Sequence, residues 1–279
     1  MSFAISESAV LSEAEFNEIS EFVKRNCGIN LHDGKKELVK ARLGKRIRQL
    51  GMGSFRQYMD SVRNDSSGAE LTTMLDQIST NLTFFFREHK HFEHLRETVI
   101  PAIRAKGKRR IRIWSAGCSS GEEPYSIAML LNEAINDLVG WDTAVLATDL
   151  STKVLGMAQR GVYRQERFRE TPKHLVSKYF SVVEKRPDGN VYQAKSSIRK
   201  LIHFARLNLM ENWPMKGPFD VIFCRNVMIY FDKTTQGRLV NRYFDILAPG
   251  GVLFIGHSES LTGTQHRYKY VQPAIYQKP

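Results

Sequence analysis

The chain has 279 residues, 42% of them hydrophobic, and a formal net charge of +12. This length and apolar content suit a folded globular protein with one large domain or two smaller ones. No run of about 18 apolar residues occurs and the first residues do not resemble a signal peptide, so we expect a cytoplasmic protein without membrane insertion. Cys27, Cys118 and Cys224 are too scattered for a disulfide framework or a zinc site.

The charge is unevenly placed along the chain. Lys plus Arg and Asp plus Glu each number 11 in the first 80 residues, whereas the remaining residues hold 30 and 18. Such a basic excess predicts an acidic partner, either nucleic acid or an acidic protein surface.

The first 80 residues predict a small all-helical domain. Ser12 and Glu15 have the spacing of a capping box, Ser54 precedes another helix, and residues 69–79 form a further one. Residues 81–110 then follow as a linker helix.

One helix of this domain, from about residue 33 to 51, has two distinct faces. At 100° per residue, the apolar side chains share one face, namely Val39, Leu43, Ile47 and Leu50. The opposite face is basic and carries Arg42, Lys45 and Arg48. A charged face of this kind is either solvated surface or a contact for an acidic partner.

From residue 111 to 279 the pattern alternates between strands and helices, which predicts an α/β domain. Strands are expected near residues 111–114, 144–148, 201–206, 219–224 and 251–256, and helices near 124–136, 151–160, 172–179 and 233–247. Residues 268–277 form a late strand, so the sheet is mostly parallel with an antiparallel edge. Asp188-Gly189 marks a β-hairpin inserted at about residues 179–200, as a docking platform or as a structural elaboration.

The stretch from Ile111 to Asp149 predicts a nucleotide-binding βαβ unit. A strand opens into a loop with Gly117 and Gly121, a helix follows, and the second strand ends at Asp149, which can hold ribose hydroxyls. The loop lacks the G-x-G-x-x-G pattern, and a carboxylate lies where a pyrophosphate would meet the helix. S-adenosylmethionine (SAM), an adenosyl ligand without phosphates, therefore fits better than a dinucleotide.

The strand at 219–224 leads into Arg225, Asn226 and Tyr230. In an open α/β sheet the ligand lies outside the carboxyl ends of the strands, so these residues are expected near Gly117 and Asp149. From the residues alone, Tyr230 is also compatible with a core aromatic.

Four motifs, in this order along nearly the whole chain, resemble the CheR family of chemoreceptor glutamate O-methyltransferases. They are residues 81–88 (Asn-Leu-Thr-Phe-Phe-Phe-Arg-Glu), 114–126, 219–231 and 256–259 (Gly-His-Ser-Glu). The resemblance implies a SAM-dependent methyltransferase with a Rossmann-like sheet, an inserted β-hairpin subdomain and a helical N-terminal substrate-recognition domain. It also implies methylation of glutamates on the cytoplasmic region of bacterial chemoreceptors in chemotactic adaptation, with S-adenosylhomocysteine as product.

The resemblance further implies roles for individual residues. The implied SAM-binding set is Asn81, Thr83, Arg87, Glu123, Asp149, Asn208, Leu209, Arg225 and Asn226. Arg87 would pair with the methionyl carboxylate or orient the incoming glutamate, and Glu123 would receive the methionyl ammonium. Tyr230 would offer its ring to the sulfonium. Because the substrate carboxylate is already ionised, no general base is needed, and His257 is expected to pack or hydrogen-bond.

The same resemblance bears on substrate recognition. Family members are thought to use the basic helix, so Arg42, Lys45 and Arg48 are expected to contact the acidic, helical receptor. The best-known members carry a Gly-x-Gly turn in the hairpin, associated with a tethering pentapeptide at the receptor C-terminus. Here the turn, residues 185–190, contains Pro187 and only Gly189, so we expect independence from the pentapeptide.

Two other functions were weighed against this one. A nucleic-acid methyltransferase would suit the basic excess, but those acting on base amines usually carry an Asp/Asn-Pro-Pro-Tyr/Phe-like motif that residues 225–228 do not match. A SAM sensor without catalysis is disfavoured because Arg87, Asp149 and Tyr230 are all present. We therefore expect neither nucleic acid nor a metal as a ligand.

Overall fold

The structure, a computed structural model, describes residues 10–79, 81–135 and 140–279. The chain forms two compact units. The first contains the described residues up to Ser79 together with Tyr230–Asp232, and the second contains Asn81–Ile229 and Lys233–Pro279. None of the described helices is long and apolar enough to cross a membrane.

The first unit is helical, as predicted. Its elements are α1 (Glu13–Cys27), a 3₁₀ turn at Asp33–Lys35, α2 (Lys36–Gln49), α3 (Phe55–Asn64) and α4 (Ala69–Ile78). The capping box is confirmed, since the Glu15 amide donates to Ser12 Oγ at 3.2 Å and the Ser12 amide donates to Glu15 Oε2 at 2.9 Å. Val39, Leu43 and Ile47 of α2 are buried as expected. Leu50 is 38% exposed because α2 ends before it, so its assignment to the buried face was wrong.

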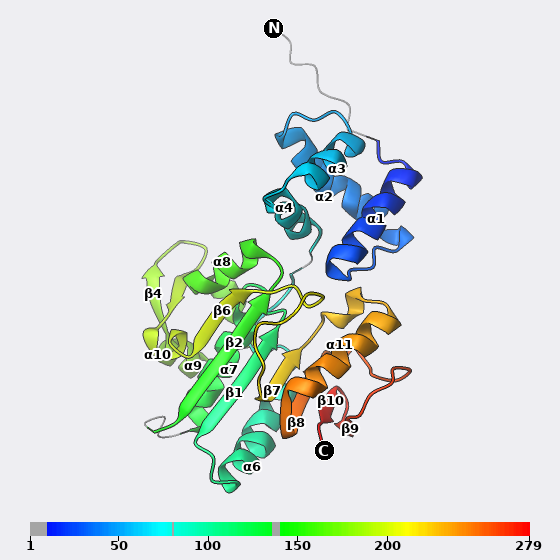
Figure 1. Cartoon of the computed structure of the whole chain (residues 1–279). Coiled ribbons are helices and arrows are strands. Elements are labelled where there is room, and N and C mark those ends of the chain that lie inside the picture. The colour runs from blue at the N-terminus through cyan, green and yellow to red at the C-terminus, as the bar shows by residue number, and fades with distance from the viewer. Residues whose placement is uncertain (1–9, 80, 136–139) are drawn as a thin grey trace. The chain divides into compact units, whose positions relative to one another are not determined.

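The second unit contains the α/β domain (Figure 1). Its helices are α5 (His89–His94), α6 (Ile100–Ala105), α7 (Glu122–Ala134), α8 (Thr152–Arg160), α9 (Lys173–Tyr179), α10 (Ser196–Arg199) and α11 (Lys233–Ile246). Its strands are β1 (Arg110–Ala116), β2 (Asp142–Asp149), β3 (Val162–Arg164), β4 (Phe180–Glu184), β5 (Val191–Ala194), β6 (Ile202–Arg206), β7 (Phe219–Cys224), β8 (Leu247–Ile255), β9 (Lys269–Gln272) and β10 (Ile275–Gln277). A π-helical turn, Leu95–Val99, joins α5 to α6. Two 3₁₀ turns, Gln165–Phe168 and Met228–Tyr230, complete the elements.

The large sheet has the strand order β6-β2-β1-β7-β8-β10-β9. The strands from β6 to β8 are parallel, and β10 and β9 are antiparallel, which confirms the predicted mixed sheet. Ala116 of β1 is in register with Thr148 of β2, and Cys224 of β7 with Ile255 of β8. The loops that follow these strands therefore begin at the same edge of the sheet.

The core of this unit lies between the large sheet and its helices. Every residue of β7 is buried, and so are the last residues of β1, as expected for central parallel strands covered on both faces. The Phe223 and Phe254 rings stack with centroids 4.5 Å apart. Trp114 is fully buried, and its indole Nε1 donates to Thr148 Oγ1 at 2.9 Å. These contacts fix the strand ends that carry the site.

Two details of the sequence prediction were wrong. Residues 268–277 form two antiparallel strands, β9 and β10, because the chain turns at Pro273 and Ala274, where Ala274 has a left-handed φ of 63°. The inserted hairpin of β4 and β5 is joined by an unpredicted third strand, β3, to give a small sheet of order β3-β5-β4. Strand β3 has only three residues, too few for an alternating pattern to reveal.

Candidate functional site

The loop after β1 is shaped by two glycines. Gly117 and Gly121 have φ values of +90° and +98°, which favour glycine. A Cβ on Gly117 would lie 2.4 Å from Val227 Cγ2, and one on Gly121 would lie 2.8 Å from Ala158 Cβ. The Gly117 amide also donates to the Thr148 carbonyl at 2.8 Å. The loop thus folds tightly against the neighbouring strand ends, as the βαβ prediction required.

Asp149 lies at the end of β2, as predicted, with 9% of its surface exposed. Its Oδ2 accepts from the Ser119 amide at 2.8 Å, and its Oδ1 accepts from the Ser151 amide at 2.9 Å. The Asp149 carbonyl accepts from the Leu207 amide at 3.0 Å, which brings the loop after β6 to the same place. The carboxylate is therefore held rigidly between the loops that follow β1, β2 and β6.

A buried ion-pair cluster occupies the neighbouring part of this edge. The Arg225 side chain is 2% exposed, and its Nη1 donates to Glu123 Oε2 at 3.1 Å while its Nη2 lies 3.2 Å from Glu88 Oε2. Ser115 Oγ donates to Glu123 Oε1 at 2.6 Å. Burial raises the pKa of the Glu123 carboxyl, and the Arg225 charge opposes that rise. The structure thus brings together Glu123 and Arg225, two residues of the predicted set, and adds Glu88.

The segment from Asn81 to Glu88 is attached to this edge mainly through its backbone. The Asn81 carbonyl accepts from Ser119 Oγ at 3.1 Å, and the Thr83 carbonyl accepts from Arg167 Nη1 at 3.0 Å. Arg225 Nη2 also donates to the Arg87 carbonyl. The expectation of a linker helix over the whole of residues 81–110 was wrong, because helix begins only at His89.

The Arg87 side chain remains partly accessible. Its Nη1 donates to the Leu82 carbonyl at 2.9 Å, and its guanidinium lies 5.8 Å from the centre of the Phe84 ring. Both are contacts within its own segment. The Arg87 main chain thus contacts the ion-pair cluster through Arg225, whereas its guanidinium bonds within its own segment.

The loop after β6 places the next two residues of the predicted set. Asn208 is buried, with its Oδ1 accepting from the Met210 amide and its Nδ2 donating to Glu211 Oε1, both at 3.0 Å. Leu209 is 9% exposed, and its carbonyl accepts from Arg242. These bonds fix the loop that begins beside Asp149.

Glu259 is a positioning residue that the sequence analysis did not identify. Its Oε2 accepts from the Asn226 amide at 3.0 Å and from the Gly256 amide, and its Oε1 accepts from the Ile229 amide at 3.1 Å. Asn226 has a left-handed φ of 58°, and a Cβ on Gly256 would lie 2.5 Å from Asn226 Nδ2. The carboxylate thus ties the loop after β7 to the loop after β8. The sequence signal was the motif at residues 256–259, which ends in Glu259 but does not indicate what its carboxylate contacts.

The structure groups Tyr230 with the helical unit, where its carbonyl accepts from the Asn30 amide at 2.7 Å. Its expected place beside the transferred methyl stays a prediction.

On α2, Lys45 and Arg48 are exposed. Arg42 is only partly exposed, and its Nη1 donates to the Ile78 and Ser79 carbonyls at 2.7 and 2.9 Å, which caps the end of α4. Arg42 is therefore less exposed than Lys45 and Arg48, and the expected contact of all three with the receptor stays a prediction.

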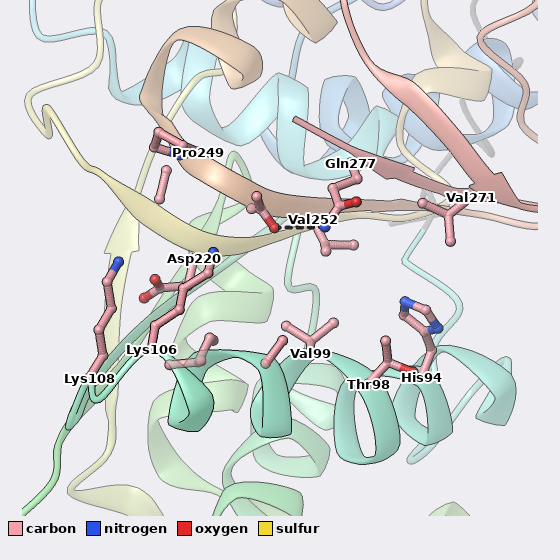
Figure 2. Close-up of a pocket in the computed structure, with 15 residues that line it drawn as sticks. His94, Thr98, Val99, Lys106, Lys108, Asp220, Pro249, Val252, Val271 and Gln277 are labelled. Carbon is pink, nitrogen blue, oxygen red and sulfur yellow. Dashed lines mark hydrogen bonds between the residues drawn. The ribbon is translucent and has the colours of Figure 1, made fainter. Parts of the chain in front are cut away.

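A cavity of about 120 Å³ lies at the opposite end of the large sheet (Figure 2). Its lining includes Lys106 and Lys108 before β1, Asp220 at the start of β7, and Gly250 in the first half of β8. Figure 2 shows the two lysines and Asp220 at one end of this cavity and His94 at the other. None of the residues predicted to bind SAM lines it.

Comparison with known proteins adds to this geometry. Residues 14–79 match the family model of the CheR methyltransferase all-alpha domain, and residues 81–276 match that of the CheR methyltransferase SAM-binding domain. The chain belongs to the CheR methyltransferase family. Its cofactor is SAM, and it is a SAM-dependent methyltransferase.

The sequence is also similar to curated CheR-family proteins over most of their length. A chemotaxis protein methyltransferase from Borreliella burgdorferi is 39% identical over 96% of this chain and 95% of that protein. The chemotaxis protein methyltransferase of Escherichia coli is 37% identical over 98% and 93%. A probable chemotaxis protein methyltransferase from Rhizobium etli is 42% identical over 85% and 89%. This chain is therefore a chemotaxis protein methyltransferase with both domains of the family.

Proposed function

We propose that this CheR-family enzyme transfers the methyl group of SAM to glutamate side chains of chemoreceptors in the bacterial cytoplasm. The products are glutamate methyl esters and S-adenosylhomocysteine. The curated members of this family are named chemotaxis protein methyltransferases, which supports a role in chemotaxis. The exposed Lys45 and Arg48 support an acidic protein as the substrate.

The carboxyl edge of the large sheet has the polar groups that SAM requires. Val227 packs against Gly117, and Ala158 packs against Gly121, so only glycine lets the loop after β1 fold this tightly beside the polar groups. Asp149 would accept from the ribose hydroxyls, Glu123 would receive the methionyl ammonium, and Arg87 would pair with the methionyl carboxylate. The remaining contacts would come from the residues whose loops close this edge, Asn81, Thr83, Asn208, Leu209, Arg225 and Asn226.

The chemistry makes few demands on side chains. When bound, SAM supplies a methyl group activated by a sulfonium centre. A glutamate carboxylate is ionised near neutral pH and forms the new O–C bond as the C–S bond breaks, so no proton is transferred and no general base is required. The enzyme contributes by aligning the carboxylate with the methyl group and excluding water from it. We assign Arg87 and Tyr230 to this alignment and no catalytic role to His257.

The observation that carries this proposal is the buried edge formed by Asp149, Glu123 and Arg225 within a chain that matches both CheR domains. The test is incubation of the protein with methyl-labelled SAM and receptor-containing membranes, followed by base treatment. We expect labelled receptor and release of the label as methanol.

Two controls test whether the label depends on the receptor glutamates and on the SAM site. Receptor with alanine in place of its methylatable glutamates should remain unlabelled, and the Asp149→Ala variant should give little label. Transfer RNA and duplex DNA are included as acceptors at physiological salt, where binding driven by phosphates is weakened. Base-stable label, or label on nucleic acid alone, would contradict glutamate methylation.

A further inference from the structure

Four histidines have no role in the proposed reaction, and two of them, His91 and His257, contact Glu88 of the buried ion-pair cluster. His89, His91 and His94 belong to α5, and His257 follows β8. Clusters of histidine in a short segment are typical of metal binding. None of the three α5 histidines has a role assigned from the sequence, and no metal was expected.

His91 is unusual among them. It is 1% exposed, yet within the part of the chain that the structure describes neither ring nitrogen has a hydrogen-bond partner. Buried polar atoms in proteins are nearly always hydrogen-bonded. A buried nitrogen without a protein partner therefore indicates that a water molecule or an ion binds there.

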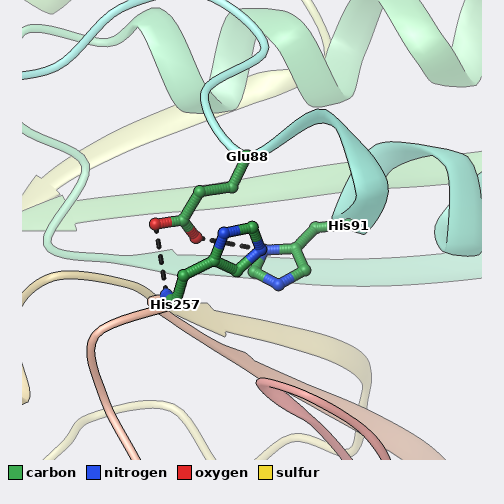
Figure 3. A group of neighbouring side chains, drawn as sticks. All are labelled: Glu88, His91 and His257. Atoms are coloured by element: carbon green, nitrogen blue, oxygen red, sulfur yellow. Dashed lines mark hydrogen bonds and ion pairs between the residues drawn. The ribbon is translucent and has the colours of Figure 1, made fainter.

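The surroundings of His91 have the distances of a metal site (Figure 3). Its Nδ1 lies 3.4 Å from Glu88 Oε2, and the two make no hydrogen bond. One ligand atom from each of Glu88, His91 and His257 lies within 4.8 Å of the other two. Ligands about 2.1 Å from a tetrahedral zinc ion are roughly 3.4 Å from one another. The Glu88–His91 pair already has this separation. The His257 side chain is exposed and completes the group.

We propose that Glu88, His91 and His257 form a binding site for a divalent transition-metal ion of the zinc type. Two imidazoles and one carboxylate are a common ligand set for such ions, and they leave a fourth position for water. The backbone supports the arrangement, because Glu88 is held at a left-handed φ of 58° and its Oε1 accepts from the His257 amide at 3.2 Å. Two ligands from distant parts of the chain are thereby fixed beside each other.

The neighbouring charges decide which ions the site takes. Arg225 Nε lies 3.3 Å from Glu88 Oε2, so a positive charge is present close to the proposed ion. Ions held mainly by charge and oxygen ligands, such as Mg²⁺ and Ca²⁺, should therefore bind poorly. Zn²⁺ forms stronger bonds with imidazole nitrogen and is the ion we expect.

The proposal is tested by titrating Zn²⁺ into the full chain in competition with a chromophoric chelator, without SAM or receptor. We expect one equivalent bound by the wild type, with affinity reduced at least about tenfold in both His257→Ala and His91→Gln. His89→Ala, which removes an exposed histidine of the same helix outside the three, is the matched control and should bind like the wild type. Tenfold excess Mg²⁺ should not displace the zinc.

Thermal unfolding of each variant shows whether it is folded. His91→Gln replaces a buried residue, so His257→Ala, at an exposed side chain, decides the outcome if His91→Gln does not fold. Failure of the wild type to bind stoichiometric Zn²⁺, wild-type affinity in His257→Ala, or an equal loss in His89→Ala would each overturn the proposal. No methyl transfer enters this experiment, so its result is independent of the proposed function.

Discussion

The two sheets of the second unit place their charged groups in opposite surroundings. At the carboxyl edge of the large sheet, the Arg225 side chain is 2% exposed between Glu123 and Glu88, whose side chains are 12% and 11% exposed. In the small sheet, Arg186 and Glu184 form an ion pair with side chains 43% and 49% exposed. Buried charges are costly unless every partner is present, whereas exposed pairs contribute little. The first edge therefore tolerates few sequences, and the second tolerates many.

The largest effect that this comparison predicts is on stability. Arg225→Ala would leave Glu123 and Glu88 buried without their cation, and breaking a buried pair in this way costs about 3–5 kcal/mol. Urea denaturation should show this loss in the free energy of unfolding. Arg186→Ala, which breaks the exposed pair of the small sheet, is the matched control and should change stability little. Equal losses in the two variants would show that burial is not what separates the two sheets.

The next effect is on cofactor binding at the same edge. Asp149 would accept two charge-assisted hydrogen bonds from the ribose hydroxyls, of about 1.5–3 kcal/mol each. Their loss in Asp149→Ala predicts a roughly hundredfold or greater loss of SAM affinity. Calorimetric titration with SAM measures it. Asp142→Ala, at the exposed opposite end of β2, is the control and should bind SAM normally. Affinity within about threefold of wild type, a change of under 1 kcal/mol, would remove Asp149 from the site.

The burial contrast also explains what the sequence could predict. Strand positions followed from apolar runs such as Val221–Cys224, and Asp149 was singled out because it ends the strand that contains Ala144–Ala147. Glu123 was named through the family resemblance, on the motif that contains the glycine loop. These signals lie within a few residues of the feature that they indicate.

Residues whose partners are distant in sequence were missed. Glu88 contacts Arg225 from 137 positions away, and Glu259 bonds Asn226 and Ile229 from 33 and 30 positions away. Both carboxylates end a motif of the family resemblance, but the motifs do not indicate which distant residues they contact. Arg42 illustrates the same limit in the helical unit, since its bonds to the end of α4 span 36 and 37 positions.

The basic face of α2 is an exposed surface, like the small sheet, so we expect a smaller effect there. Lys45→Glu with Arg48→Glu should lower receptor methylation several-fold at low ionic strength, with unchanged SAM affinity, because both side chains are exposed and would meet acidic receptor surface. The loss should shrink in high salt. Arg42→Glu should instead lower the thermal stability, since its guanidinium caps α4.

The control for this pair carries the same change in net charge elsewhere in the helical unit. Arg25→Glu with Arg56→Glu reverses two exposed charges on α1 and α3. Receptor methylation should be less affected in this variant than in the α2 pair. Equal losses would mean that net charge, and not the α2 face, attracts the receptor.

The smallest expected effect is at the small sheet, where we predict no binding of the receptor pentapeptide. Strand β4 is an edge strand with Val182 and Val183 44% and 50% exposed, so an extended peptide has an edge to pair with.

The turn beyond that edge opposes such pairing. Pro187 lacks an N–H and has a fixed φ, and the Asn190 amide and carbonyl are already bonded to Gln165, at 3.0 and 2.9 Å. Titration of the aromatic-rich pentapeptide should therefore give no measurable affinity, and receptors without it should be methylated equally well. Pro187→Gly, which makes the turn Gly-Asp-Gly, should gain affinity if the turn is the obstacle. A micromolar dissociation constant for the wild type would show that the exposed edge alone suffices and that this enzyme is tethered after all.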